Sequence, residues 1–583
     1  MNMNNNTGRM PLVIAVTGHR DVDTLQDSRD HSTISEAFTA CLQYWLKTVG
    51  PDTPIHLLCG MAQGADLLAL KAAMQLKSAG ARITPLPCLV APLPQLKESY
   101  DNQEDFEYAL EICEKYGCTI TAPSQSAISD MDEAYPYLYQ GAVFARYANV
   151  VIALWDSKPA KGHGGTADVV RMQLGDIPDI PEIKALFPKG FDGSNGGVVQ
   201  HIPVTRCRPS SDDVDISYPT SPLKGSPYPV YLSCSHHQSV QDFLSHEFTT
   251  LLEQIRLFNR KHKVIDTQKA ERDNAQPGLT PALSLLFHYA DTKAVKRRDR
   301  YQKSVMTFFF CAFTALLALE FVEWGVSSTS GYIATGIVLF ALITCIGLYW
   351  TSRFRGWKRD YQLYRGVAEA IRLRGYLNLA DIAPCESSLL PRQMRNNLPL
   401  FQQAVYLTEW AWWQDKSIIA PDKVKDAWME SQISYLKTRL TATPGKGIRE
   451  ARKIHSNLLK MPGHYHRTLG RLSKFLMTSF VVLLTSLFTL QLTGTADYYT
   501  WLYLGIKVML FTSGILALWI NLAGYEHLCV SYSRLIALYQ RAATELENTS
   551  DYHYTLQELA KEAFSEHCEW VYYNAKSEYN SGH

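Results

Sequence analysis

The sequence predicts a two-part chain. An α/β domain with a Rossmann-like open parallel sheet comes first, and an α-helical membrane region with four transmembrane helices follows. Two observations carry this prediction. In residues 1–290, short apolar runs alternate with helical patterns, whereas the rest of the chain contains four apolar runs long enough to span a bilayer. The nearly neutral mean hydropathy of the whole chain hides this division.

Charge and cysteine usage exclude several classes of protein. The 57 Lys and Arg residues are balanced by 56 Asp and Glu residues, so no basic field points to DNA or RNA. The twelve cysteines are scattered singly without a CxxC pair, which favours reduced thiols in the cytosol over a disulfide scaffold or zinc ribbon. The CSHH run at residues 234–237 and the pair His464 and His466 lack partners at ligand spacing, so no metal is expected. The first ten residues, MNMNNNTGRM, lack the apolar core of a signal peptide, so the N-terminal domain is expected in the cytosol.

The sheet is predicted from six short apolar runs. Strands are expected at residues 12–17, 55–59, 81–89, 118–122, 150–155 and 198–204. Helices are expected between them at residues 33–48, 65–76 and 104–116. Such alternation produces a parallel sheet with helices on both faces, and ligands of these sheets bind outside the carboxyl ends of the strands. The residues that follow each strand are therefore the candidate ligand site.

Three of these loops carry glycines that let a backbone approach a phosphate. Their candidate ligand-binding residues are Thr17, Gly18, His19, Arg20, Gly60, Gly64, Asp66, Gly162, Gly164, Gly165, Thr166 and Asp168. Arg20 presents a planar fork to a phosphate, and the second loop opens a helix whose N-terminal amides face an anion. Thr166 is expected to cap the third helix. Three phosphate-type loops at one edge indicate a nucleotide more strongly than a single loop does.

Structural roles remain open for some of these residues. Asp66 either accepts a hydrogen bond from a ribose hydroxyl or caps its helix, and Asp168 has the same alternative of a cap. His19 and His163 are either ligand contacts or ordinary loop residues.

Two of the loops resemble a known superfamily. GMAQGADLLAL resembles the Gly-x-Ala-x-Gly-x-Asp turn of the DNA-processing protein DprA. GHGGTADVV resembles the Pro-Gly-Gly-x-Gly-Thr-x-x-Glu loop of the Lonely Guy phosphoribohydrolases. Residues 10–206 therefore resemble the SLOG superfamily, whose members bind nucleotides or nucleotide-derived messengers at this edge. The resemblance implies a cyclic nucleotide or an ADP-ribose-type messenger as ligand.

The third loop departs from the hydrolases at one position. When Gly165 and Thr166 are aligned with the family's Gly-Thr, Val169 occupies the place of the catalytic Glu. Asp168 comes one residue early, which turns its side chain by about 100° on a helix, and Lys161-Gly162-His163 replaces the leading Pro-Gly-Gly. The sequence therefore predicts binding without cleavage, and no catalytic residue. The alternative is a membrane-anchored nucleotide N-glycosidase that uses Asp66 or Asp168.

The membrane region is predicted from four apolar runs, at residues 305–322, 332–350, 475–492 and 501–522. They form two hairpins, because the connections at 323–331 and 493–500 are short. Those connections contain no Lys or Arg, whereas the opposite flanks are basic, so both termini are expected in the cytoplasm of a multi-pass plasma-membrane protein. The alternative is four buried helices of a soluble core. Glu320, Glu323 and Lys507 either reach the membrane interface or line a pore or a subunit contact.

The soluble helices beside the hairpins carry a second resemblance. Amphipathic helices are expected at 364–380 and 532–547, one after each hairpin, as a weak internal repeat. HYADTKAVKRRDRYQ, YRGVAEAIRLRGY and DAWMESQISYL, the last through Trp428, Gln432 and Tyr435, resemble the SLATT family of two-span modules found beside nucleotide-signalling genes in bacterial conflict systems. The predicted segments are 1–206 (nucleotide domain), 207–280 (linker and coupling helix), 281–390 (first module) and 391–583 (second module).

Together these features predict a membrane-bound sensor-effector, and the two resemblances imply that it serves bacterial anti-phage defence by abortive infection. A nucleotide-derived messenger is expected to bind one state of the protein better than another and so drive assembly. A single pair of hairpins cannot line a wide pore, so a homo-oligomer that permeabilises the bacterial inner membrane is expected. The alternatives are the N-glycosidase or phosphoribohydrolase above and a nucleotide-gated ion channel with a homeostatic role.

Overall fold

The computed structural model describes residues 8–26, 31–122, 134–160, 162–187, 197–208, 214–221, 223–260, 276–324, 329–384, 389–390, 398–442, 461–492, 500–548 and 552–579. The chain forms two compact units. Unit 1 comprises Met1–Ala290, Gly366–Asp422 and Ala560–Asn574, and unit 2 comprises Asp291–Arg365, Lys423–Leu559 and Ala575–His583. The segment boundaries at 206, 280 and 390 stay predictions.

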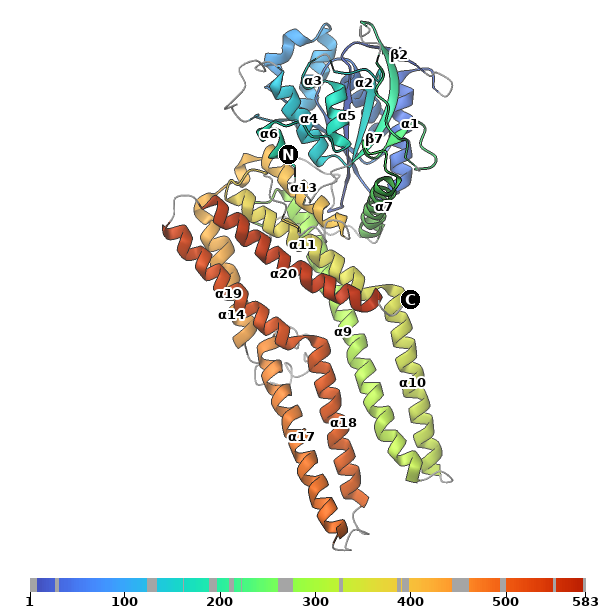
Figure 1. Ribbon diagram of the computed structural model, residues 1–583, viewed down its shortest axis with the longest axis vertical. Coiled ribbons are helices and arrows are strands. Elements are labelled where there is room, and N and C mark those ends of the chain that lie inside the picture. Colours follow the sequence, from blue (N-terminus) through green and yellow to red (C-terminus); the bar gives the residue numbers. More distant parts are fainter. Residues whose placement is uncertain are drawn as a thin grey trace. The chain divides into compact units, whose positions relative to one another are not determined.

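Unit 1 is built on an eight-stranded sheet with the strand order β2-β7-β6-β1-β3-β4-β5, in which β8 also pairs with β7 (Figure 1). The strands are β1 (Leu12–Gly18), β2 (Val22–Leu25), β3 (Ile55–Cys59), β4 (Ile83–Leu89), β5 (Cys118–Thr119), β6 (Val150–Trp155), β7 (Val198–Arg206) and β8 (Val230–Tyr231). The six predicted strands are confirmed and pair in parallel, as their apolar, doubly buried sequences require. The two antiparallel edge strands, β2 and β8, are additions that the sequence did not predict.

The helices of the sheet domain follow the predicted order with three additions. They are α1 (Ile34–Val49), α2 (Ala65–Ser78), η1 (Leu93–Ser99), α3 (Gln103–Tyr116), α4 (Tyr135–Tyr147), α5 (Thr166–Gln173), α6 (Pro181–Lys184) and α7 (Gln238–Arg260). The additions are η1, α4 and α6. A capping box of Thr33 and Glu36 begins α1. Helix α4 was not predicted, because it is buried on most of its sides and has no polar face. Near the end of α7, Asn259 exchanges two hydrogen bonds with the backbone of Met10, which ties that helix to the sheet.

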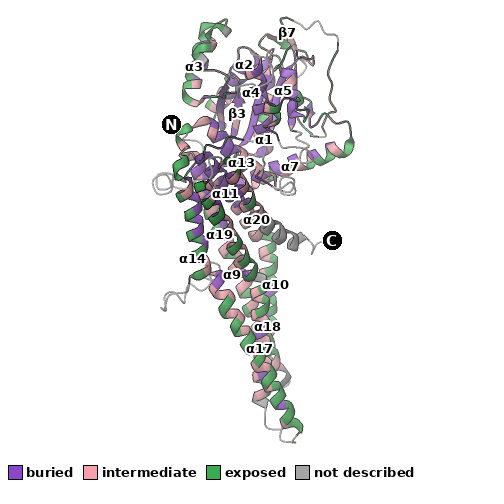
Figure 2. Ribbon diagram, turned by 60° about the vertical axis from the view of Figure 1, so that its left-hand side comes forward, coloured by how far each residue is buried: buried purple, intermediate pink, exposed green. Residues whose placement is uncertain are grey.

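A helix from the second half of the sequence also belongs to unit 1. Helix α13 (Pro399–Gln414) lies at the amino edge of the sheet, where Gln403 donates to the carbonyl of Pro11 (3.2 Å) and accepts from Asn149 (2.8 Å). Pro11 and Asn149 directly precede β1 and β6. Glu409 of α13 forms a buried ion pair with Arg146 of α4 (2.7 Å). The purple core of Figure 2 therefore includes α13 as well as the sheet.

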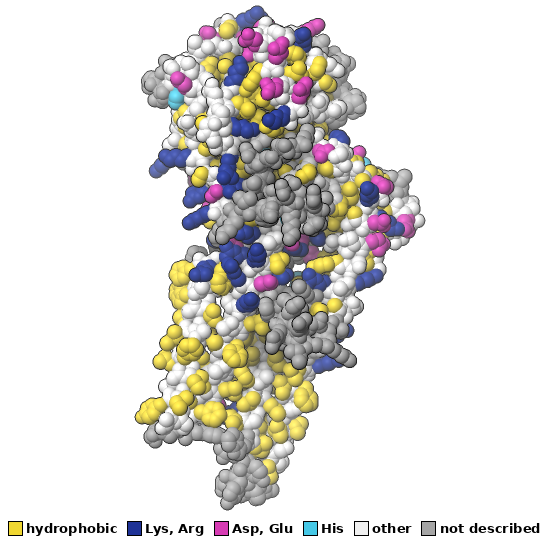
Figure 3. Space-filling view, turned by 180° about the vertical axis from the view of Figure 1, so that it is seen from behind, with side chains coloured by type: hydrophobic (Ala, Val, Ile, Leu, Met, Phe, Trp, Pro, Cys, Tyr) yellow, Lys and Arg dark blue, Asp and Glu magenta, His cyan; other side chains and the backbone are white. Residues whose placement is uncertain are grey.

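Four helices are long and apolar enough to cross a membrane. Unit 2 contains three of them completely and the greater part of the fourth. They are α9 (Pro281–Trp324, which begins in unit 1), α10 (Thr329–Arg355), α17 (Pro462–Leu492) and α18 (Thr500–Ala523). Large apolar side chains on α10 are well exposed, among them Ile333 (61%) and Phe340 (73%). Figure 3 shows a largely hydrophobic surface over these helices. A soluble core would bury such side chains, so the exposure suggests a multi-pass membrane protein.

The charged side chains of the spans form a pair. Lys507 of α18 donates to Glu320 of α9, with Nζ and Oε2 2.6 Å apart. Pairing is the usual arrangement of ionisable groups within a membrane. The side chain of Glu323 lies outside the described part of the chain, and the sidedness of the membrane region stays a prediction.

Soluble helices complete the chain. They are α11 (Trp357–Leu379), η3 (Lys416–Ile418), η4 (Pro421–Lys423), the π-helix η5 (Lys425–Glu430), α14 (Ser431–Thr441), α19 (Tyr525–Asn548) and α20 (His553–Tyr579). The predicted amphipathic helix at 532–547 lies within α19, and the one at 364–380 lies within α11 except for its last residue. Trp428 is fully buried and meets the ring of Tyr539 of α19 edge-on at 6.3 Å, whereas Tyr435 is exposed.

Candidate functional site

The three glycine loops converge at one edge of the sheet. Strand β1 lies between β6 and β3, so the loops that follow these strands are neighbours. The chain runs outward from β1 through β3, β4 and β5, then returns to β6 on the other side of β1. This reversal is a topological switch point, the usual ligand position in open α/β sheets.

A cavity of about 540 Å³ lies at this edge. Ten of the twelve predicted residues line it: Thr17, Gly18, His19, Arg20, Gly60, Asp66, Gly162, Gly164, Gly165 and Thr166. The remaining two, Gly64 and Asp168, do not line it. The volume falls within the usual range for small-molecule sites, roughly 300–1,000 Å³.

Gly64 and Asp168 hold the loops in shape. Gly64 has φ +88°, and a Cβ on it would lie 2.1 Å from the carbonyl oxygen of Arg20, so only glycine fits between the first loop and the start of α2. Asp168 accepts a hydrogen bond from the backbone N–H of Gly164 (2.9 Å). Asp168 therefore has a structural role, but as the third residue of α5 and not as its cap. The expected cap by Thr166 is wrong, because Gly165 is the N-cap residue and Thr166 is the first residue of the helix, with no side-chain capping bond. Lys161, at the start of the third loop, lies outside the described residues.

A charged network surrounds the first loop. Nε2 of His19 is hydrogen-bonded to Oδ1 of Asp156 at 3.0 Å. Arg206 donates to Asp21 (2.9 Å) and lies 3.9 Å from Asp156. Burial lowers the pKa of His19 more than Asp156 raises it, so the imidazole is neutral near pH 7. Sequence reasoning missed Asp156, although it directly follows β6 and the rule applied to the glycine loops points to it.

Arg20 is the cation best placed to meet a ligand. Its guanidinium lies 5.6 Å from the ring centre of Tyr137, another lining residue, and its side chain is exposed. No described carboxylate lies within ion-pair distance of it. The other two cations that line the cavity are already paired, Lys158 with Asp215 (2.9 Å) and Arg206 with Asp21. Arg20 and Tyr137 together offer a charge for a phosphate and an aromatic face for a base.

Asp66 is a buried carboxyl group facing the same cavity. Its Oδ2 accepts a hydrogen bond from the backbone N–H of Ala62 (3.1 Å). Burial raises the pKa of Asp66 to about 7, although this bond and the charge of Arg20 act in the opposite direction. The neutral carboxyl is therefore accessible near neutral pH, and that form donates a hydrogen bond. A strongly perturbed carboxyl in a cavity is typical of functional sites.

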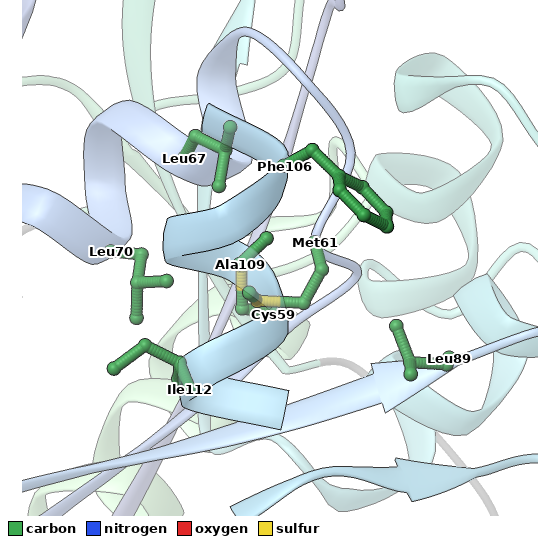
Figure 4. Packing of buried hydrophobic residues seen from close by; sticks show 8 residues of the cluster. All are labelled: Cys59, Met61, Leu67, Leu70, Leu89, Phe106, Ala109 and Ile112. Atoms are coloured by element: carbon green, nitrogen blue, oxygen red, sulfur yellow. The ribbon is translucent and has the colours of Figure 1, made fainter. Parts of the chain in front are cut away.

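The second loop is held rigidly by its surroundings. Met61 has φ 62°, a left-handed conformation that costs energy in a residue with a side chain. Its side chain packs into a buried cluster shown in Figure 4, made of Cys59, Met61, Leu67, Leu70, Leu89, Phe106, Ala109 and Ile112. The hydroxyl of Tyr100 donates to the Met61 carbonyl. The core thus maintains a strained backbone at the edge of the cavity.

The position of the hydrolase glutamate carries no carboxylate. Val169 is 4% exposed, and its side chain packs so closely on Gly141 that a Cβ there would lie 2.8 Å from it. Among the described residues that line the cavity, only Asp21 and Asp66 carry carboxyl groups. No group of three or more His, Cys, Asp or Glu residues in the described ranges is placed to hold a metal ion.

Compared with protein-family models, curated proteins and solved structures, the chain gives no match. Its class therefore follows from the fold and the site alone. It is a protein with an N-terminal Rossmann-like α/β domain, a polar cavity at the switch point of that domain, and four helices suited to a membrane.

Proposed function

We propose that the protein is a membrane-bound sensor-effector. The switch-point cavity binds a nucleotide-derived messenger, binding shifts an assembly equilibrium, and the hairpins of the assembly permeabilise the membrane. The observation that carries the proposal is the pairing of Arg20 and Tyr137 in a cavity of about 540 Å³, on a chain with four candidate spans. A ligand drives such a change only by binding one state better than the other.

The chemistry of the cavity supports an anionic ligand with an aromatic part. Arg20 brings a positive charge with no described carboxylate at ion-pair distance, and Lys158 and Arg206 bring two more that are paired, while burial favours the neutral form of Asp66 as the pH falls below 7. The N-terminus of α5 adds backbone amides close to the third loop. A cyclic nucleotide or an ADP-ribose-type messenger, as the SLOG resemblance implies, combines the required phosphate and base.

Binding without cleavage is the favoured activity. Val169 occupies the place of the hydrolase carboxylate, and Asp168 is engaged by the backbone of its own loop. The membrane-anchored N-glycosidase remains the second candidate, because the raised pKa of Asp66 suits a general acid. Incubating the purified protein with NAD and nucleotides and measuring base release distinguishes the two, since base release would establish the hydrolase.

The biological setting follows from the two resemblances. A SLOG-like sensor joined to SLATT-like modules implies bacterial anti-phage defence from the inner membrane, through a homo-oligomer. The nucleotide-gated channel with a homeostatic role is the third candidate. Flux assays on proteoliposomes separate the two membrane mechanisms: ligand-dependent release of a large dye indicates permeabilisation, and ion-selective current indicates a channel.

The decisive experiment is a ligand screen on the full chain in nanodiscs. Thermal shift and calorimetry with cyclic nucleotides, ADP-ribose and NAD are expected to reveal one binder. Arg20→Ala is expected to lower the affinity for that ligand roughly 10- to 100-fold, because it removes a charge-assisted hydrogen bond. Arg171→Ala is the matched control, because Arg171 lies outside the cavity in an exposed pair with Asp176. If no nucleotide shifts the melting temperature, the sensor proposal fails.

A further inference from the structure

A second cavity lies at the opposite, amino edge of the same sheet. It has a volume of about 300 Å³. Its walls come from the segment before β1, from β3 and β4, from the ends of α2 and α3, and from α9 and α13. All of these residues belong to unit 1. The cavity is therefore separate from the switch-point site and independent of the function proposed for it.

Two buried donors of this cavity have no acceptor. Among the described residues, nothing accepts a hydrogen bond from Nε of Arg9 or from Nε1 of Trp410. Arg9 is 6% exposed and Trp410 is 5% exposed, and both line the cavity. Nη1 of Arg9 donates to Asp52 at 2.6 Å, whereas Nε has no acceptor among the described residues. Buried polar groups are almost always satisfied in folded proteins, so two orphaned donors on side chains that line one cavity are unusual.

The charged side chains that line the cavity have one sign, although Arg9 is already ion-paired with Asp52 outside the lining (2.6 Å). Arg9, Lys77 and Lys115 line it, and no Asp or Glu is among its described lining residues. The two lysines lie 4.9 and 5.2 Å from the ring centre of Tyr116. Burial would raise the pKa of Tyr116, but the hydrogen bond and charge of Lys77, followed by those of Lys115, lower it. Burial lowers the pKa of His56 to about 4, so that side chain adds no charge at neutral pH.

The rest of the lining is apolar. Leu86, Leu283, Leu286 and Leu407 form this part of the wall together with Pro11, Ala282 and Ala411. The first turn of α9 supplies Ala282 and Leu283, and the N-terminus of a helix favours negative charge. Donors and cations at one part of a cavity and leucines at another match a ligand that has an anionic head and an apolar body.

We propose that this cavity binds an amphipathic anion, an aliphatic chain that ends in a carboxylate or a phosphate. The head accepts hydrogen bonds from Arg9 and Trp410 and is neutralised by Lys77 and Lys115. The chain lies against the leucines. Free fatty acids and alkyl phosphates share this chemistry.

The test is calorimetry on the full chain in phosphatidylcholine nanodiscs, with empty nanodiscs as reference. Decanoate, decyl phosphate, decanol and inorganic phosphate are the probes. Decanoate and decyl phosphate are expected to bind. The probe with the higher affinity indicates whether the natural head group is a carboxylate or a phosphate. Decanol and inorganic phosphate are expected to bind at least about 10-fold more weakly, because each lacks one half of the recognised chemistry.

Three variants test the assignment of residues. Lys115→Gln and Trp410→Phe are each expected to weaken the binding of decanoate and decyl phosphate roughly 3- to 10-fold. Leu283→Trp is expected to abolish their binding, because the larger side chain fills the cavity. Lys47→Gln, an exposed lysine near the end of α1, is the control. Lys115 is exposed, so its variant retains the fold. Equal binding of decanol and decanoate, binding of inorganic phosphate as tight as that of decyl phosphate, or unchanged binding by all three variants would overturn the proposal.

Discussion

At the scale of single residues, burial controls the charge of the switch-point cavity. It lowers the pKa of His19 and raises the pKa of Asp66, so both side chains tend towards their neutral forms near pH 7. The positive charge of Arg20 then faces the ligand without a full opposing carboxylate. The site therefore favours an anion more strongly as the pH falls below 7.

Asp66 also links stability to pH. Its pKa is about 7 in the folded protein, against 3.8 for an ordinary Asp. Between these values the folded state keeps a proton that the unfolded state has lost, so the contribution of Asp66 to stability is largest below about pH 4 and falls as the pH rises to 7. Asp66→Asn is expected to remove this dependence, worth roughly 2–4 kcal/mol. Melting temperatures of the two proteins between pH 5 and 8 test this, and parallel curves would contradict it.

At the scale of elements, the sheet was predictable and two helices that position its cavities were not. Strands β1, β3 and β6 are continuous apolar runs, so their ends, and with them the ten predicted lining residues, could be placed from sequence. Helices α4 and α13 are buried on most of their surface and lack the polar face by which a pattern reveals a helix. The contact of Glu409 with Arg146 spans 263 residues, and no local pattern encodes it.

Helix α4 connects the cavity to α13. Tyr137 and Gln140, in its first half, line the switch-point cavity, while Arg146 at its end holds Glu409 at 2.7 Å. Glu409→Ala leaves the Arg146 guanidinium buried without its charged partner, which is expected to cost roughly 3–5 kcal/mol. The double change Arg146→Met with Glu409→Met removes both charges and is expected to restore most of that loss.

The melting temperature of the full chain measures the effect of Glu409→Ala. Asp176→Ala is the control, because it breaks an exposed pair with Arg171 and is expected to cost less than about 1 kcal/mol. A Glu409→Ala variant as stable as this control would show that α13 does not depend on the ion pair.

At the scale of the whole molecule, the chain passes between the two units several times. Helix α9 begins beside the second cavity, at the amino edge of the sheet in unit 1. It continues into unit 2, where it carries the first apolar run (Figure 1). Helix α11 crosses the boundary in the opposite direction, from unit 2 into unit 1. The alternation of apolar and basic segments predicted the spans, but it did not predict that residues 366–422 fold with the sheet domain, because that assignment depends on tertiary contacts.

The pair of Glu320 and Lys507 joins the first hairpin to the second. Their atoms lie 2.6 Å apart, and Glu320 is 12% exposed against 43% for Lys507, so the carboxylate of Glu320 would be left largely buried without the lysine. Lys507→Glu places two carboxylates together and is expected to destabilise the hairpin pair by about 3 kcal/mol or more. The reciprocal double change, Glu320→Lys with Lys507→Glu, rebuilds the pair and is expected to recover most of the loss. Yield and monodispersity in detergent, together with thermal melts, measure both proteins. A double variant no better than the worse single variant would show that the two hairpins do not meet through this pair.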